Sequence, residues 1–174
     1  MSQHEGPARE KQEKILKVLF IGFAAVPVLY FAVCVVLLRR GFRPIHPGFA
    51  PLTPANYNIL RIVLAVISIV EALFVLNIRR AIDSGNIFGP VKWFFNQLTE
   101  SKTDDMSTVA NFNISIYAFC VSVAIYGMIL FLLNGTIIDT YMFFILSEIL
   151  FLVFVPAKAY INKLIAVKEN SVQE

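Results

Sequence analysis

The sequence predicts an all-α integral membrane protein, with four transmembrane helices arranged as two tandem hairpins and a short interfacial helix in the loop between them. Hydrophobic residues make up 57% of the 174 residues, whereas a soluble domain averages about 45–50%. The mean hydropathy is +0.70. Most apolar residues lie in four long runs, and two of these runs enclose a lone glutamate, Glu71 or Glu148. These features together predict the fold class.

Each run approaches the roughly 20 apolar residues that cross a hydrocarbon core about 30 Å thick. Backbone groups in lipid have only one another as partners, so such runs become helices. The first run lacks the small-residue cleavage pattern of a signal peptide, and we expect it to be retained. The predicted spans are Leu16–Leu38, Ile59–Ile78, Phe112–Leu133 and Ile137–Val155.

The spans divide the chain into five parts: an N-terminal tail (1–14), a first hairpin (15–83), a middle loop (84–111), a second hairpin (112–161) and a C-terminal tail (162–174). The two tails are polar.

Local signals predict the connections between the spans. The first loop holds four prolines and two glycines, so we expect an extended connection ending in the helix caps Asn56 and Asn58. In the middle loop, Pro90 suits the first position of an amphipathic helix lying in the membrane interface, with a soluble helix packed on the loop as the alternative. The last two spans join through a turn at Asn134 and Gly135.

The distribution of basic residues predicts the orientation. Eleven of the fifteen Lys and Arg residues lie near the termini or around the middle loop, and four lie around the first loop. Because cytoplasmic loops carry the excess of basic residues, we expect both termini in the cytoplasm and the protein in the plasma (inner) membrane. The net charge of +3 requires no nucleic acid as a partner.

The sequence offers little for a cofactor or for catalysis. Cys34 and Cys120 lie inside predicted spans, and the two histidines, His4 and His46, lie in a terminus and a loop. We therefore expect no metal site, no haem and no other cofactor. Without a nucleophile-and-base motif or a glycine-rich phosphate loop, we also expect no catalytic residues and no enzymatic activity.

The two glutamates are the strongest functional signal. An ionised carboxylate at the bilayer centre costs about 2.5 kcal/mol or more. Arg61 lies about 15 Å from Glu71 by helical rise, and no basic residue is in reach of Glu148 along its own helix. We therefore expect both carboxyl groups to hold a proton, and to release it when water or an arginine comes near.

Small and polar residues are expected around the glutamates. Folding the last hairpin about Gly135 brings a row of small residues in the third span to the depth of Glu148, where they allow close helix approach. This row is Ala118, Cys120, Ser122 and Ala124. In a purely structural alternative, the glutamates are neutral acids that pin helix register by bonding across the bundle. The polar candidates on these helices are Ser68, Asn77, Ser122, Tyr126 and Ser147.

An internal repeat relates the two halves of the chain. Aligning the glutamates sets "IVEALFVLNIRR" over "LSEILFLVFVPA" and preserves Glu-x-Leu-Phe. A tandem hairpin with one mid-membrane glutamate in "VEAL" or "SEIL" resembles the proteolipid (c or K) subunits of rotary ATPases. The resemblance implies that Glu71 and Glu148 carry ions, and that the small-residue row is the counterpart of the family's glycine-rich inner helix. Ala72 and Ile149 stand where sodium-binding members place a hydroxyl, so the resemblance implies protons rather than sodium.

Three functional hypotheses follow. The first is a proton-translocating membrane subunit, with sodium as the less favoured ion, that works as a homo-oligomer or beside other membrane subunits in the lipid bilayer. The second is a non-catalytic structural or accessory subunit of a membrane complex, in which the glutamates pair within the bundle or with a partner. The third is a sensor, scaffold or lipid-interacting protein.

Overall fold

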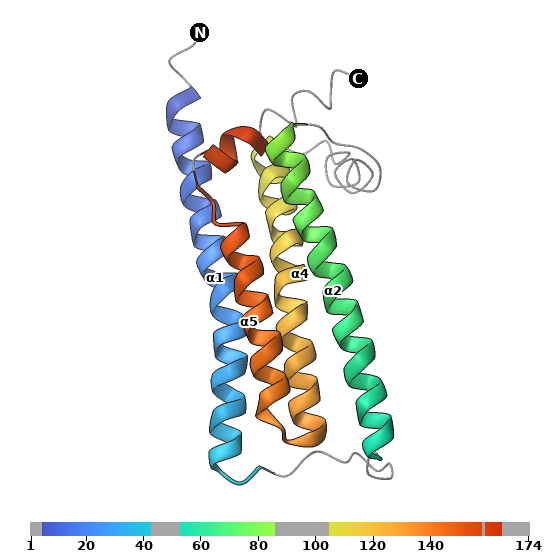
Figure 1. Cartoon of the computed structure of the whole chain (residues 1–174). Coiled ribbons are helices and arrows are strands. Elements are labelled where there is room, and N and C mark those ends of the chain that lie inside the picture. Colours follow the sequence, from blue (N-terminus) through green and yellow to red (C-terminus); the bar gives the residue numbers. More distant parts are fainter. Residues whose placement is uncertain (1–4, 43–52, 86–104, 158, 165–174) are drawn as a thin grey trace.

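The computed structural model describes residues 5–42, 53–85, 105–157 and 159–164, and its regular structure in these ranges is entirely helical. Four helices run up and down in alternation (Figure 1). They are α1 (Glu5–Arg39), α2 (Pro54–Ser84), α4 (Asp105–Asn134) and α5 (Ile137–Val153). Residues 159–164 add a short helical segment across the end of the bundle where α1 begins (Figure 1).

Three of the described helices are long and apolar enough to cross a membrane, which indicates an integral membrane protein. The candidate spans are Glu13–Arg39, Pro54–Ser84 and Val109–Asn134. Helix α5 has 17 residues, about 26 Å of helical rise, and ends before the predicted limit at Val155. Pro156 explains this end, because a proline disfavours helical backbone at the residue before it.

Helices α4 and α5 form the close-packed centre of the bundle. A Cβ atom on Gly127 of α4 would lie only 2.8 Å from the Cβ of Phe143 and 3.1 Å from the Cα of Thr140, both on α5. The turn between the two helices lies at Asn134 and Gly135, as predicted. Gly135 has a φ of 72°, which favours glycine, and its N–H donates to the carbonyl of Phe131 at 2.6 Å.

Helices α1 and α2 flank this centre. Each packs against both α4 and α5, and α4 and α5 lie between α1 and α2 (Figure 1). The prediction of α1 and α2 as a packed hairpin is therefore not confirmed. Aromatic side chains fill much of the core, with Tyr117 of α4 in ring contact with Phe20 of α1 and Phe151 of α5. The outer faces of α1 and α2 expose large apolar side chains, as lipid-facing helices do.

The start of α2 differs from the prediction. Thr53 is the N-cap, and its hydroxyl accepts a hydrogen bond from the N–H of Asn56 at 3.3 Å. Neither Asn56 nor Asn58 is the cap, because Pro54 suits the first helical position and starts the helix earlier. The interfacial helix predicted after Pro90 falls outside the described residues.

Candidate functional site

Glu71 is held by two hydroxyl groups of the neighbouring helix. Ser122 Oγ lies 2.9 Å from Glu71 Oε2, and the Tyr126 hydroxyl donates to Oε1 at 2.8 Å. Ser122 and Tyr126 are one turn apart on α4, so they meet the two oxygens of one carboxyl group on α2. Ser68 does not take part, because its hydroxyl donates to the carbonyl of Leu64 on its own helix at 2.9 Å. The contacts tie α2 to α4 near the middle of the bundle.

The Ser122 hydroxyl lies within hydrogen-bond distance of two acceptors. Ser122 Oγ lies 2.7 Å from the carbonyl oxygen of Phe119 as well as 2.9 Å from Glu71 Oε2. A serine hydroxyl has a single hydrogen to donate. It can therefore donate to Glu71 or to the Phe119 carbonyl, whereas the Tyr126 hydroxyl donates to Glu71 Oε1.

Glu148 has a different environment. Its side chain is half buried on α5, and its buried Oε1 has no hydrogen-bond partner in the described part of the chain. Phe144, one turn before Glu148, stacks on Phe31 of α1 with ring centroids 5.0 Å apart. Helices α1 and α5 are antiparallel, so one turn after Phe144 on α5 corresponds to one turn before Phe31 on α1. Glu148 therefore lies at about the level of Pro27. Glu148 therefore belongs to the α1–α5 side of the bundle, away from the Glu71 site.

Pro27 alters the helix that faces Glu148. A proline within a helix has no N–H to donate to the carbonyl four residues earlier, which here belongs to Phe23. Pro27 itself is buried. This proline lies at about the level of Glu148, whose Oε1 has no partner among the described residues.

The row of small residues divides between different surroundings. Ser147 Oγ donates to the carbonyl of Cys120 at 2.6 Å, which agrees with the expected depth of the row beside Glu148. Ala118 is exposed, Cys120 and Ala124 are buried, and Ser122 contacts α2. Alternate residues of a helix point to different sides, so the four do not form one surface. The closest approach of α4 and α5 lies instead at Gly127.

An ion pair that the sequence reading missed joins α2 to α5. Arg61 Nε lies 2.9 Å from Asp139 Oδ1, and the hydroxyl of Tyr57 donates to Asp139 Oδ2. Asp139 is buried in the first turn of α5, where the helix dipole favours a negative charge. The internal repeat offered a signal, because the alignment sets Arg61 over Ile138, directly beside Asp139.

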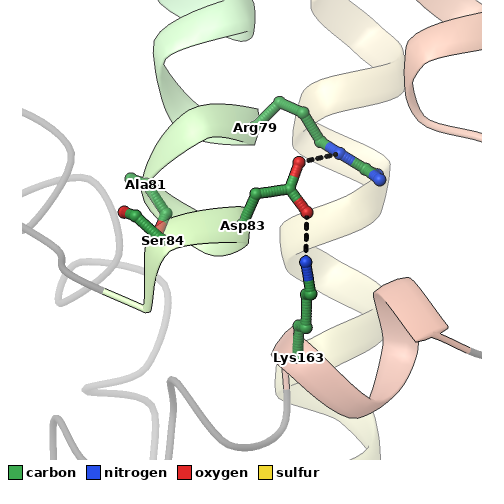
Figure 2. Close-up of polar contacts among 5 residues, drawn as sticks. All are labelled: Arg79, Ala81, Asp83, Ser84 and Lys163. Carbon is green, nitrogen blue, oxygen red and sulfur yellow. Dashed lines mark hydrogen bonds and ion pairs between the residues drawn. The ribbon is translucent and has the colours of Figure 1, made fainter.

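A second charged cluster lies at the opposite end of α2 (Figure 2). Asp83 contacts Arg79 Nε at 3.0 Å through Oδ2 and accepts from Lys163 at 2.9 Å through Oδ1. The Arg79 guanidinium lies 4.7 Å from the centroid of the Tyr160 ring. The hydroxyl of Tyr160 donates to Asn113 Oδ1 at 3.0 Å, and burial raises the pKa of Tyr160, so this donor keeps its proton.

The spacing of these groups gives a depth scale along α2. Eighteen residues separate Arg61 from Arg79, about 27 Å of helical rise, which is close to the hydrocarbon thickness of about 30 Å. Glu71 lies between the two arginines, near the middle of this distance. The distance between the two charged clusters is therefore close to the thickness of a hydrocarbon core, and Glu71 lies near the middle of that distance.

The described residues contain no cluster of three His, Cys, Asp or Glu side chains that suits a metal ion. Comparisons with protein-family models, curated proteins and solved structures find no match for this chain. The proposed function therefore rests on the contacts of the buried polar groups in the bundle.

Proposed function

We propose that the protein is a proton-translocating membrane subunit with four transmembrane helices, in which Glu148 is the carboxyl group that exchanges protons. The observation that carries the proposal is the buried Oε1 of Glu148, which has no hydrogen-bond partner among the described residues. A helical protein of three long apolar spans provides the setting. In the proposed orientation both termini face the cytoplasm, in line with the basic residues around them.

The cost of burial assigns a proton to Glu148. An ionised carboxylate near the bilayer centre, without a cation or donor, costs about 2.5 kcal/mol or more, so the neutral form is favoured there. A neutral carboxyl group has an O–H that it can donate to an acceptor. Access of water or of a partner's arginine then favours release of the proton.

Glu71 is assigned a supporting role. Ser122 and Tyr126 engage both of its oxygens, so exchange at Glu71 requires a break in contacts between α2 and α4. We propose that the two halves of the repeat have diverged, with the first glutamate holding the bundle and the second serving exchange. A ring of identical copies, as the resemblance to rotary proteolipids implies, is one way to carry such a carboxyl group past a stationary cation.

A second candidate function is an accessory subunit of a membrane complex. The observation that favours it is the pair of interhelical polar contacts, Glu71 with Ser122 and Tyr126, and Arg61 with Asp139. Both fix helix register without requiring ion movement. Stoichiometry in mild detergent distinguishes the two functions, because the accessory role predicts one or two copies beside different chains.

The test begins with a hydrophobic carbodiimide, which reacts with protonated carboxyl groups in lipid, followed by peptide mapping across pH. We expect rapid labelling of Glu148 that falls as pH rises, and slower labelling of Glu71 because α4 covers its oxygens. Asp139 is an internal control, because Arg61 and Tyr57 already engage both of its carboxyl oxygens. Absence of labelling at Glu148 in the folded protein contradicts the proposal.

Proton flux into vesicles provides the functional measurement. We expect Glu148→Gln to abolish flux while the helical content and assembly stay unchanged. The matched variant Glu71→Gln keeps a polar group opposite Ser122 and Tyr126, and we expect it to retain most of the flux. Full flux with Glu148→Gln overturns the proposal, and loss of flux with Glu71→Gln alone reverses the roles of the two glutamates.

A further inference from the structure

A groove between α2 and α5 opens on the outer face of the bundle and has a cavity volume of about 400 Å³. Most of its lining is apolar, and Ile69, Met142 and Ile149 expose more than half of their surface. Arg61 and Asp139 lie at one end of the groove. The groove therefore combines a long apolar wall with a charged end.

The length and lining of the groove indicate what fits in it. From Arg61 to Ile69 the helical rise is about 12 Å, and beyond the charged end the lining is apolar apart from Ser68. An alkyl chain of a lipid suits such a lining.

The charged end supplies hydrogen-bond donors that the bundle does not use up. The ion pair to Asp139 runs through the Nε of Arg61, and the Arg61 side chain keeps 51% of its surface exposed. A guanidinium has five N–H donors, and the other oxygen of Asp139 already accepts from Tyr57. Donors therefore remain for a second anionic oxygen, with the fork geometry that suits phosphate.

The depth of Arg61 in the bilayer relates the charged end of the groove to its apolar wall. Arg61 lies about 15 Å from the level of Glu71, which is half of a hydrocarbon core about 30 Å thick. That is the level at which phospholipid phosphates meet the acyl chains. We propose that this groove binds one phospholipid, with its phosphate on Arg61 and one acyl chain lying along the groove.

The test uses the purified full-length protein in detergent, with retained lipid counted by native mass spectrometry. The two probes are dioleoylphosphatidylglycerol and dioleoylglycerol, which has the same chains and no phosphate. We expect one retained phospholipid per chain, with about tenfold tighter binding than dioleoylglycerol, as a charge-assisted contact provides. Equal retention of the two lipids overturns the proposal, and so does a dimer that excludes both.

Two pairs of variants locate the site. Ile149→Trp fills the groove and should remove the retained lipid, whereas Leu152→Trp, exposed on the same helix but outside the lining, should not. Arg61→Gln combined with Asp139→Asn removes the guanidinium without leaving a buried charge unpaired, and should abolish the tenfold preference. Arg80→Gln, which also removes a guanidinium but at the other end of α2, should keep it. Unchanged binding in both Ile149→Trp and the double variant places the lipid elsewhere and contradicts the proposal.

Discussion

Ser122 and Tyr126 give Glu71 surroundings that Glu148 does not have, although the two glutamates occupy matching places in the repeat. The sequence offered both hydroxyl groups, with Ser68 and Asn77, as candidate partners of the glutamates in the structural alternative. It did not predict which glutamate they would serve, since that depends on how α2 lies against α4. The Arg61–Asp139 pair was missed for the same reason: its members are 78 positions apart and meet only through packing.

At the residue scale, Tyr126→Phe tests the hydrogen bond between Tyr126 and Glu71. The change removes one hydrogen bond of 2.8 Å, and interhelical bonds of this kind in membrane proteins average about 0.6 kcal/mol. We expect the free energy of unfolding to fall by about that amount in a detergent titration. Tyr141→Phe is the control, because Tyr141 is exposed on α5 and the loss there should be near zero. An equal loss in both variants contradicts the assigned bond.

The helices themselves were predicted from apolar run length, and their boundaries were not. Each of the first three extends beyond its apolar run, because residues outside the run are helical too, as those between the cap Thr53 and the start of the run at Ile59 illustrate. α5 is shorter than its run because Pro156 follows. Hydropathy reports where a helix enters lipid, whereas capping residues and prolines decide where the helix ends.

At the element scale, Gly127→Ala tests the packing of α4 on α5. An added Cβ would meet the Cβ of Phe143 at 2.8 Å and the backbone of Thr140, so the two helices must move apart. We expect a loss of about 1–3 kcal/mol in the free energy of unfolding, as overpacking typically costs. Chemical denaturation in detergent is the measurement.

Gly22→Ala on α1 is the matched control for this substitution. A Cβ on Gly22 meets nothing within 4 Å, and alanine is about 1 kcal/mol better than glycine inside a helix. We expect this variant to be as stable as the parent protein or more stable. If Gly127→Ala lowers the free energy of unfolding and Gly22→Ala raises it, the position of the glycine, rather than the residue type, decides the effect.

For the whole molecule, the order of the four helices in space is the feature that the sequence did not reveal. A repeat of two hairpins suggests that each hairpin packs on itself, but α4 and α5 lie between α1 and α2. Aromatic residues of α4 contact both outer helices, as Tyr117 with Phe20 of α1 and Phe119 with Phe74 of α2 illustrate. Periodicity identifies the apolar face of a helix but does not indicate which other helix packs against that face.

The segment 159–164 closes one end of the molecule, and Tyr160→Phe tests this closure. The substitution leaves the buried Asn113 Oδ1 without its donor, so we expect a loss of about 1–3 kcal/mol and faster proteolysis near the C-terminus. Tyr117→Phe is the comparison, because its bond to the Phe154 carbonyl is longer, at 3.4 Å, and should contribute less. A smaller effect at Tyr160 than at Tyr117 contradicts the closure.

The position of α4 and α5 between the outer helices also affects the order of events during synthesis. When α1 and α2 have left the ribosome, the surfaces on which they pack do not yet exist, because α4 and α5 supply them. We therefore expect the first half of the chain to remain in the bilayer as two helices that are not yet packed into the bundle. Assembly is completed only when the last hairpin inserts between them, so a ribosome stalled before α4 leaves a product that membrane quality control should recognise as unassembled.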